Sequence, residues 1–417
     1  MAPVGCWESL AAALQAGADS VYFGIEHLNM RARSSANFTT QDMHEIASRC
    51  RQAGVKTYLT LNTVMYPDDL PLMREIVDNA REAGITAIIA SDIAVMQYAV
   101  SQSVEVHLST QLNIANTEAL RFYAQFADVV VLARELNMQQ VAQIHRDIIT
   151  QDIRGRNGEL VRIEMFCHGA LCMAVSGKCY LSLNNLGMSA NRGACAQICR
   201  RGYIVKDKDS ELELEVDNQY IMSPKDLKTI RFLDKMLDAG VRVLKIEGRA
   251  RGPEYVKTVI ECYKEAVAAW QKGEYQLPDI NNKLDIWDER LSRVFNRGFW
   301  DGYYQGQTLG EWNDSHGNKA TRRKIYAGHC TNYFKNISVA EFLIEAHVVC
   351  RTDELLVTGE TTGAYECSAN LMRVYHSEGK QEEITATDTA LQGQLLCIRT
   401  DTVIRRGDKL YIMEHTL

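Results

Sequence analysis

The sequence predicts an α/β protein whose main part is a (β/α) barrel of the triosephosphate isomerase type, complete or distorted, followed by a small antiparallel β-barrel. The first observation is a repeated phrase in which a helical stretch ends at Ala-Gly and a short apolar strand follows. It occurs at Ala16-Gly17, Ala53-Gly54, Ala83-Gly84 and Ala239-Gly240. Glycine commonly ends a helix because it adopts the left-handed conformation without strain. The phrase therefore predicts alternating helices and strands, as in a parallel sheet.

Helical spacing of apolar residues between these phrases is the second observation. Residues 39–52 and 68–83 place apolar side chains three and four positions apart, which is typical of an amphipathic helix. Further strands are expected at 104–110, 127–134 and 161–167. About seven or eight such units fit within residues 1–270, and this number favours a barrel over an open sheet.

The domain boundaries follow from where this alternation begins and stops. We assign residues 1–270 to the barrel domain, including a cysteine-rich insertion at 167–222, residues 271–324 to a connecting segment, and residues 325–417 to the C-terminal β-barrel domain. Within the insertion, residues 203–223 alternate like a β-hairpin. Residues 223–240 predict a helix that begins with Ser223 as its N-cap and Pro224 at its first helical position.

Composition and charge restrict the function classes. The 417 residues carry a formal charge of -7, so the chain would meet nucleic acid or an anionic membrane only through a local basic patch. No stretch approaches about 18 uncharged apolar residues, and the first residues lack the basic start of a secretory signal. We expect a cytoplasmic protein without a membrane partner. In that reducing compartment the 12 cysteines serve metal binding, catalysis or burial rather than disulfides.

Four cysteines, Cys172, Cys179, Cys195 and Cys199, lie close together in the insertion. Four thiolates satisfy a tetrahedral metal ion or a cubane iron-sulfur cluster. The spacing lacks the paired C-x-x-C knuckles of zinc ribbons, so a 4Fe-4S cluster is favoured over zinc, and reactive or merely buried cysteines stay open as a third interpretation. Basic neighbours such as Arg192 would stabilise a negatively charged cluster, grip a phosphate backbone, or simply be solvated.

Polar residues follow the predicted strands, at the edge where ligands gather in parallel α/β folds. Together with polar residues of the insertion, they supply the candidates for binding a substrate or cofactor. These candidates are Arg31, Arg33, Asn62, Gln111, Asn191, Arg192, Arg200 and Arg249. A solvated turn or a helix cap is the alternative for any one of these residues. A binding site is indicated because so many of them are expected at the same edge of the sheet.

Several motifs, in a fixed order, carry a resemblance to a known family. They are E-x-F-x-H-G-A-L-C at 164–172, S-G-K-C at 176–179, N-R-G-A-C-x-Q-x-C-R at 191–200, S-P-K-D-L at 223–227 and K-I-E-G-R at 245–249. With these motifs, and with F-N-R-G at 295–298, the chain resembles the peptidase U-32 family, which was first filed as collagenase-like proteases. The resemblance covers nearly the whole chain.

The resemblance implies a function different from the family's name. The chain is similar to members that hydroxylate a tRNA uridine, a ribosomal RNA cytidine or the ubiquinone ring, and these members carry a 4Fe-4S cluster on four cysteines. Carried over to this sequence, the ligands would be Cys172, Cys179, Cys195 and Cys199. The close C-x-x-x-C ending looks most like the RNA-modifying members. Their tRNA branch is associated with prephenate, so the resemblance also implies a small dicarboxylate in the pocket.

These inferences predict an iron-sulfur enzyme that hydroxylates a pyrimidine in RNA, most specifically by prephenate-dependent 5-hydroxylation of a tRNA wobble uridine. The RNA partner would be a tRNA anticodon stem-loop, whose unstacked bases can enter a pocket. We assign proton transfer to Glu247 and His168, with Lys245 as electrostatic support. A structural salt-bridge network is the alternative for Lys245, Glu247 and Arg249.

Two other functions stay open. One is a U-32 peptidase acting on collagen-like substrates. The chain has neither an H-E-x-x-H nor a G-x-S-x-G motif, although a Cys-His dyad using Cys167 or Cys172 could form in space. The other is an accessory or electron-transfer factor in a hydroxylation complex. The sequence does not predict the oligomeric state.

Overall fold

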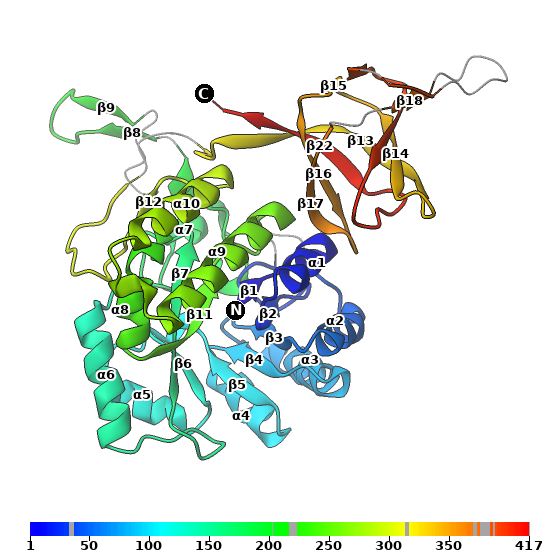
Figure 1. Cartoon of the computed structure of the whole chain (residues 1–417). Helices are drawn as coiled ribbons and strands as arrows, with labels where there is room; N and C mark the ends of the chain where they lie inside the picture. Colours follow the sequence, from blue (N-terminus) through cyan, green and yellow to red (C-terminus); the bar gives the residue numbers. More distant parts are fainter. Residues whose placement is uncertain are drawn as a thin grey trace.

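The structure of the chain is a computed structural model that describes residues 1–32, 37–201, 203–216, 223–312, 317–369, 373–375, 384–386 and 388–416. Arg33, one of the candidate binding residues, lies outside the described residues, as does the end of the cysteine-rich insertion at 217–222. Figure 1 shows an α/β part that is built from the first three quarters of the chain, and a C-terminal part made of strands.

A mostly parallel sheet forms the centre of the α/β part. Within the described residues its strands are β1 (Ala2–Pro3), β2 (Ser20–Phe23), β3 (Lys56–Leu61), β4 (Ala87–Ala90), β5 (Glu105–Leu108), β6 (Val129–Val131), β7 (Arg162–Gly169), β10 (Asp226–Lys228), β11 (Val241–Ile246) and β12 (Phe299–Trp300). Strands β1 to β7 pair in sequence order, and β11 pairs with β7 in parallel. The Met1 amino group donates to the Leu244 carbonyl over 2.7 Å, so the sheet curls until its first strand meets β11.

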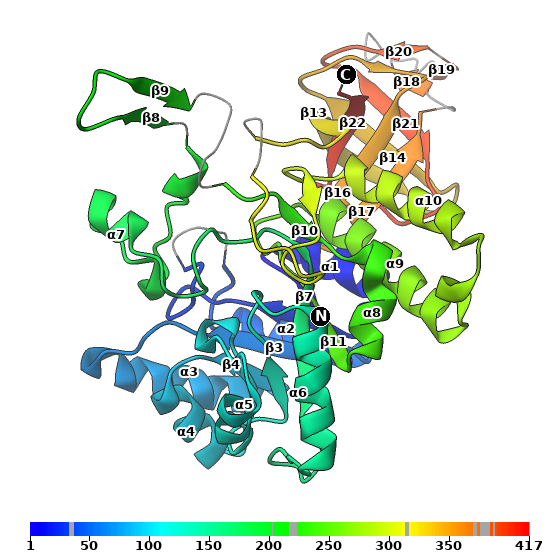
Figure 2. The same cartoon turned by 90° about the vertical axis from the view of Figure 1, so that its left-hand side faces the viewer.

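Helices cover the outer face of this sheet (Figures 1 and 2). They are α1 (Trp7–Gln15), α2 (Asp42–Gln52), α3 (Leu70–Ala83), α4 (Ile93–Ser101), α5 (Thr117–Ala124), α6 (Met138–Thr150), α8 (Leu233–Asp238), α9 (Pro253–Gln271) and α10 (Ile280–Arg293). All four glycines of the Ala-Gly phrase have positive φ angles, between 69° and 97°. The sequence prediction of helices that end at these glycines is therefore confirmed.

The two faces of the sheet carry different side chains. On β2, Val21 and Phe23 are fully buried in the large core that the helices complete, whereas Tyr22 belongs to a separate cluster with Tyr58 and Ile89. Side chains alternate between the faces of a strand, so this second cluster marks the inner face of the curled sheet. The ionisable residues described below lie on this inner face and at its carboxyl end.

The helix expected at 223–240 is shorter than the sequence predicts. Residues Asp226–Lys228 form β10, which pairs antiparallel with β7 and parallel with β12, and α8 begins only at Leu233. The cap signal fails because Ser223 is used elsewhere: its hydroxyl accepts a hydrogen bond from Arg200 over 2.8 Å. Pairing on both sides of β10 outweighs the local helix signal.

The segment at 271–324, predicted as a connection, also contributes side chains to the large core of the α/β part. Side chains of α10 and β12, among them Leu284, Trp287 and Trp300, are part of the large core.

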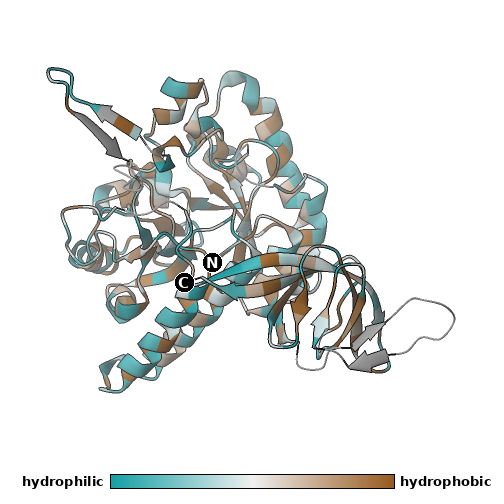
Figure 3. Cartoon of the chain, turned by 90° about the horizontal axis from the view of Figure 1, so that it is seen from above, coloured by the Kyte–Doolittle hydropathy of each residue, from teal (hydrophilic) through white to brown (hydrophobic). Residues whose placement is uncertain are grey.

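The short helix α7 (Leu181–Leu186) and the hairpin of β8 (Tyr203–Lys206) and β9 (Glu213–Val216) belong to the cysteine-rich insertion. This hairpin confirms the alternation seen in the sequence, and it projects from the body in Figures 2 and 3. Short 3-10 turns occur at Pro67–Asp69, Thr110–Leu112, Ala190–Arg192, Ile198–Arg200, Ile230–Phe232 and Glu274–Gln276.

The C-terminal part is a curled antiparallel sheet. Its described strands are β13 (Arg322–Phe334), β14 (Val339–Ile344), β16 (Glu354–Gly359), β17 (Gly363–Ser368), β18 (Arg373–Tyr375), β19 (Ile384–Ala386), β21 (Leu395–Arg399) and β22 (Lys409–His415), with β15 (Val349–Cys350) and β20 (Thr389–Ala390) as a separate pair. Phe342, Leu355 and Leu396 lie in its own apolar core. The sheet contacts α1, where the Gln15 side-chain amide donates to the Thr362 carbonyl over 3.0 Å. None of the described helices combines the length and apolar character that crossing a membrane requires.

Candidate functional site at the carboxyl end of the parallel sheet

A buried ionic network lies on the inner face of the sheet. Lys245 of β11 donates through Nζ to Glu164 Oε1 of β7 over 2.8 Å. The other oxygen of Glu164 is 3.7 Å from Nδ1 of His107, whose Nε2 is 3.1 Å from Glu105. Burial alone would raise the pKa of Glu164, but Lys245 and His107 lower it to about 2. Glu164 is therefore ionised at neutral pH, and Lys245 is its principal partner.

Glu247 follows β11 at the carboxyl end of the sheet, in a strongly cationic setting. Its Oε1 is 3.4 Å from Nη2 of Arg31, and the Tyr22 hydroxyl donates to its Oε2 over 3.4 Å. Burial opposes ionisation, but four nearby cations lower the pKa of Glu247. They are Arg31, Arg134, Arg249 and Lys245. Even after Glu164 and Glu247 are counted, positive charge is in excess here, so the site can attract an anion that carries more than one charge.

Arg249 anchors the loop that carries Arg31. Its Nη1 donates to Asn29 Oδ1 over 3.1 Å and to Thr60 Oγ1 over 2.9 Å. Burial lowers the pKa of Arg249 to about 10, so the guanidinium keeps its charge at neutral pH. A side chain at Gly24 would not fit, because a Cβ atom there would lie 2.4 Å from Arg249 Nη1. Asn29 was not among the predicted site residues, although its position two residues before the candidate Arg31 was a usable signal.

The cysteine segment, residues 170–201, lies over this end of the sheet and is clamped to two of its loops. Arg192 Nη2 donates to Asp69 Oδ1 over 3.0 Å, and the Arg192 guanidinium stacks on the Tyr66 ring at 4.2 Å. The hydrogen bonds to Arg192 lower the pKa of Asp69. After β5, the Asn113 side-chain amide donates to the Ser176 carbonyl over 3.0 Å. The segment is therefore held in place by charged and polar contacts.

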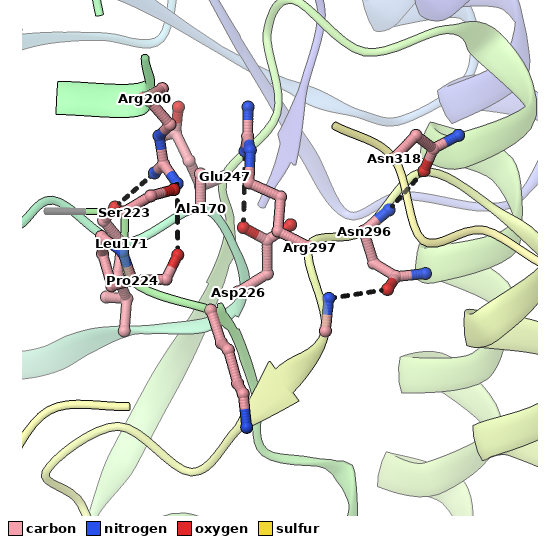
Figure 4. Close-up of polar contacts among 12 residues, drawn as sticks. Ala170, Leu171, Arg200, Ser223, Pro224, Asp226, Glu247, Asn296, Arg297 and Asn318 are labelled. Atoms are coloured by element: carbon pink, nitrogen blue, oxygen red, sulfur yellow. Dashed lines mark hydrogen bonds and ion pairs between the residues drawn. The ribbon is translucent and has the colours of Figure 1, made fainter. Parts of the chain in front are cut away.

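Arg200 joins the two ends of the inserted region. It donates to the Leu171 carbonyl over 2.7 Å, to the Ser223 hydroxyl over 2.8 Å and to the Pro224 carbonyl over 3.1 Å, as Figure 4 shows. Arg192 and Arg200 were expected to contact a substrate. In the structure both guanidinium groups donate hydrogen bonds to other parts of the chain, and these contacts hold the cysteine segment in place.

The four cysteines come together above the carboxyl end of the sheet. Cys172 is exposed, and Cys179, Cys195 and Cys199 are half-buried. Burial raises the pKa of the Cys199 thiol, Arg200 lowers it, and electrostatic interaction with Cys172, Cys195 and Cys179 raises it, which indicates that the four thiols lie within range of one another. Among the described residues, no three His, Cys, Asp or Glu side chains are arranged to hold a single metal ion.

Arg31 connects the thiols to Glu247. Burial would lower the pKa of Arg31, but Glu247, Cys172 and Cys195 raise it. The Arg31 guanidinium therefore lies 3.4 Å from the Glu247 carboxylate and interacts electrostatically with two of the four thiols. The prediction that the insertion faces the polar strand ends is consistent with this placement.

His168 lies apart from this group. Its ring packs against Tyr263 and Tyr255 of α9 and Phe299 of β12, with centroids 5.5–5.9 Å away. Burial lowers the pKa of His168 to about 3, so the ring is neutral at physiological pH. His168 and Glu247, the two residues predicted to transfer protons, are linked through the backbone, since the Glu247 amide donates to the His168 carbonyl over 2.8 Å.

The remaining candidates line the edge of the sheet. Asn62 accepts from the Met30 amide over 3.2 Å and donates to Ser109 Oγ over 3.4 Å. Ser109 donates to Gln111 Oε1 over 3.0 Å, so the two candidates share this serine. The side-chain oxygen of Asn191 is buried without a hydrogen-bond partner among the described residues. Asn62 and Gln111 therefore help to shape the loops, whereas Asn191 keeps an acceptor unused.

Comparison with known proteins identifies relatives of two kinds. A model of peptidase family U32 matches residues 5–314. A Porphyromonas gingivalis protein named "Collagenase" is 61% identical over 411 residues, which cover 99% of this chain and 96% of that protein. The Bacillus subtilis "tRNA hydroxylation protein P1" is 32% identical over 320 residues, 75% of this chain and 73% of that protein. The Escherichia coli "23S rRNA 5-hydroxycytidine C2501 synthase" is 32% identical over 288 residues, 68% of this chain and 42% of that protein.

Proposed function

Because the chain belongs to peptidase family U32, we propose that it is an iron-sulfur enzyme that hydroxylates a pyrimidine in RNA. The most specific form of the proposal is 5-hydroxylation of a tRNA wobble uridine that depends on prephenate. One observation carries it: four cysteine thiols lie at the carboxyl end of the sheet, where Arg31 interacts with Cys172 and Cys195 as well as with the Glu247 carboxylate. The RNA-modifying names of two relatives, at 32% identity each, support the choice of substrate.

The spacing of the four cysteines supports a 4Fe-4S cluster over zinc, because it lacks the paired C-x-x-C knuckles of zinc ribbons. A cubane cluster is larger than a single zinc ion, so its thiolates stand further apart. Cys172, Cys179, Cys195 and Cys199 would hold it, and when bound it would supply electron transfer or Lewis-acid chemistry. Arg31 would offset its negative charge.

The cationic pocket supports a small dianionic co-substrate. Arg31, Arg134 and Arg249 present guanidinium groups, which pair well with carboxylates. A dicarboxylate such as prephenate fits this excess of positive charge. Glu247, ionised by the same cations, would accept a proton or orient a hydroxyl group. Lys245 on β11 would stabilise the ionised Glu247 through its positive charge. We also propose that the curled sheet is a closed (β/α) barrel, which would place this pocket in its mouth.

The name of the 61%-identical relative favours a second candidate, a peptidase. The described histidine contacts do not support it. The partners of His107 and His329 are carboxylates, and that of His168 is the Tyr263 hydroxyl, not a thiol or serine. A cysteine or serine peptidase needs its nucleophile beside such a base. We therefore rank proteolysis second.

Two measurements test the proposal together. Anaerobically purified protein should contain iron and sulfide, and a Cys199→Ser variant should lose most of both, whereas Cys262→Ser, buried in α9, should keep them. RNA from cells that lack the protein should lose one hydroxylated pyrimidine, which the wild-type gene restores and the Cys199→Ser gene does not. An unchanged nucleoside profile would contradict RNA modification. Cleavage of a collagen-like peptide that disappears in the Cys199→Ser protein would favour the peptidase instead.

A further inference from the structure

A narrow cleft opens beside Cys172, and the proposed function leaves it without a role. Its walls come from four separate parts of the chain: the loop after β6, the cysteine segment, Pro224, and residues 300–312. The lining includes Arg134, Cys172, Ser176, Trp300, Tyr303 and Trp312. The cleft therefore borders one of the four thiols directly.

Three aromatic side chains form one wall. Trp300 and Tyr303 meet edge to face, with ring centroids 5.3 Å apart, and the Trp300 indole N–H donates to the Lys225 carbonyl over 3.1 Å. All three rings converge on Gly310, where a Cβ atom would lie 3.5 Å from Trp312, 3.5 Å from the Tyr303 hydroxyl and 3.8 Å from Trp300. Trp300 is only 5% exposed, whereas Trp312 is 43% exposed. A fixed aromatic wall thus ends in an indole that is open to solvent.

Arg134 supplies the polar side of the cleft. Its guanidinium stacks on the Phe166 ring at 3.9 Å and donates through Nη1 to the Ala170 carbonyl over 3.2 Å. Its Nε is buried and has no hydrogen-bond partner among the described residues. Arg134 is also one of the four cations that lower the pKa of Glu247, so this one residue belongs both to the cleft and to the cationic surroundings of Glu247. The unpaired N–H of Arg134, next to the aromatic side chains of the wall, could donate a hydrogen bond to a carbonyl oxygen of a flat ring that stacks on them.

We propose that this cleft receives the ring of a single unstacked pyrimidine, which stacks on Trp312 while Arg134 donates to a carbonyl oxygen of the base. The inference rests on the proposed function and deepens it, because it names the surface that holds the base. The cleft is narrow, so the exposed Trp312 indole must rotate outward as the base enters. Aromatic stacking of this kind recognises single-stranded nucleic acids. The base would then lie beside Cys172 and next to the Glu247 pocket.

The test uses the full chain and a fluorescent RNA hairpin with one uridine in its loop, beside the same hairpin with an abasic site at that position. Wild-type protein should bind the uridine hairpin more tightly by roughly 5- to 100-fold, the usual range for one base stacked on an aromatic ring. Trp312→Ala should remove this preference, and Trp312→Phe should keep most of it. Phe122→Ala is the matched control, since Phe122 is a 52% exposed aromatic residue on α5.

The outcomes separate this inference from the proposed function. If the uridine hairpin is bound and hydroxylated but the abasic hairpin binds equally well, the stacking site is wrong and the proposed function stands. If neither hairpin binds, both are overturned. The wild-type comparison of the two hairpins decides the matter even if Trp312→Ala folds poorly. Preferential binding of a proline-rich collagen-like peptide, lost in Trp312→Phe and Trp312→Ala alike, would overturn the base site in favour of a peptide site.

Discussion

Gly193 of the cysteine segment packs against Asn29 so closely that a Cβ atom at Gly193 would lie 2.5 Å from the Asn29 carbonyl oxygen. Asn29 belongs to the loop that presents Arg31 to Glu247. Gly193→Ala should therefore push the segment away from this loop. We expect the variant to lose most of its iron and sulfide, measured per chain after anaerobic purification. In metal-free protein, Cys195 should react several-fold faster with iodoacetamide, measured by mass spectrometry.

Gly187→Ala provides a matched control in the same segment. Both glycines have a positive φ, 84° at Gly193 and 63° at Gly187, so alanine at either position costs about 1–2 kcal/mol of backbone strain. Only Gly193 has a close neighbour, since nothing lies within 4 Å of a Cβ atom at Gly187. Equal losses in both variants would show that strain, and not the contact with Asn29, is responsible.

The buried pair of Lys245 and Glu164 predicts a large effect on stability. Lys245→Met would leave the Glu164 carboxylate without its principal partner inside the curled sheet. Removing one member of a buried ion pair typically costs about 3–5 kcal/mol, so urea unfolding should show a free energy of unfolding lower by that amount. Adding Glu164→Gln should recover part of it, because an amide carries no net charge. Lys272→Met, at the exposed end of α9, should change stability by less than about 0.5 kcal/mol.

Glu164 also predicts the response to acid. Its pKa is lowered to about 2 in the folded protein, whereas an unfolded glutamate titrates at about 4.3. The ionised carboxylate therefore adds stability above the unfolded value, and this contribution is lost as pH falls from about 4.5 towards about 2. Unfolding of metal-free protein should show that the advantage of wild type over Glu164→Gln shrinks through this range. A difference that stays constant with pH would contradict the lowered pKa.

The features that could be predicted from the sequence are those encoded within a few neighbouring residues. The Ala-Gly phrase predicted helix ends because a C′ glycine acts locally. The alternation at 203–223 predicted β8 and β9 for the same reason. Arg31, Glu247 and Arg249 could be predicted to meet, since parallel strands share one carboxyl edge.

The features that were missed depend on partners that are distant in the sequence. Asp226–Lys228 is a strand because β7 and β12 flank it, and no local signal reports those neighbours. Arg200 donates hydrogen bonds to Ser223 and Leu171, and these intramolecular partners are visible only in the folded chain. The direction of His168 was not predictable by alternation, because the pairing of β7 with β11 shifts register between Lys245 and Ile246, beside His168.

The contact between the C-terminal sheet and α1 depends on Gly363. A Cβ atom there would lie 2.8 Å from the Ala12 amide nitrogen, and the φ of Gly363 is 68°. Gly393 offers a control in the same sheet, because its φ is 86° and nothing lies within 4 Å of a Cβ atom. Gly363→Ala should therefore loosen the contact, while Gly393→Ala pays only the backbone strain.

Limited trypsin digestion should reveal the difference. Once the sheet separates from α1, we expect cleavage between α10 and β13 to accelerate several-fold in Gly363→Ala relative to Gly393→Ala, with each part still folded by circular dichroism. The Lys257 ammonium donates to the Ala364 carbonyl over 3.0 Å, so Lys257→Met should produce a smaller acceleration in the same direction. If Gly363→Ala and Gly393→Ala were cleaved at the same rate, the close approach to α1 would not hold the two parts together, and the docking would depend on the apolar contacts of Leu356 and Ala364 with Ala12 instead.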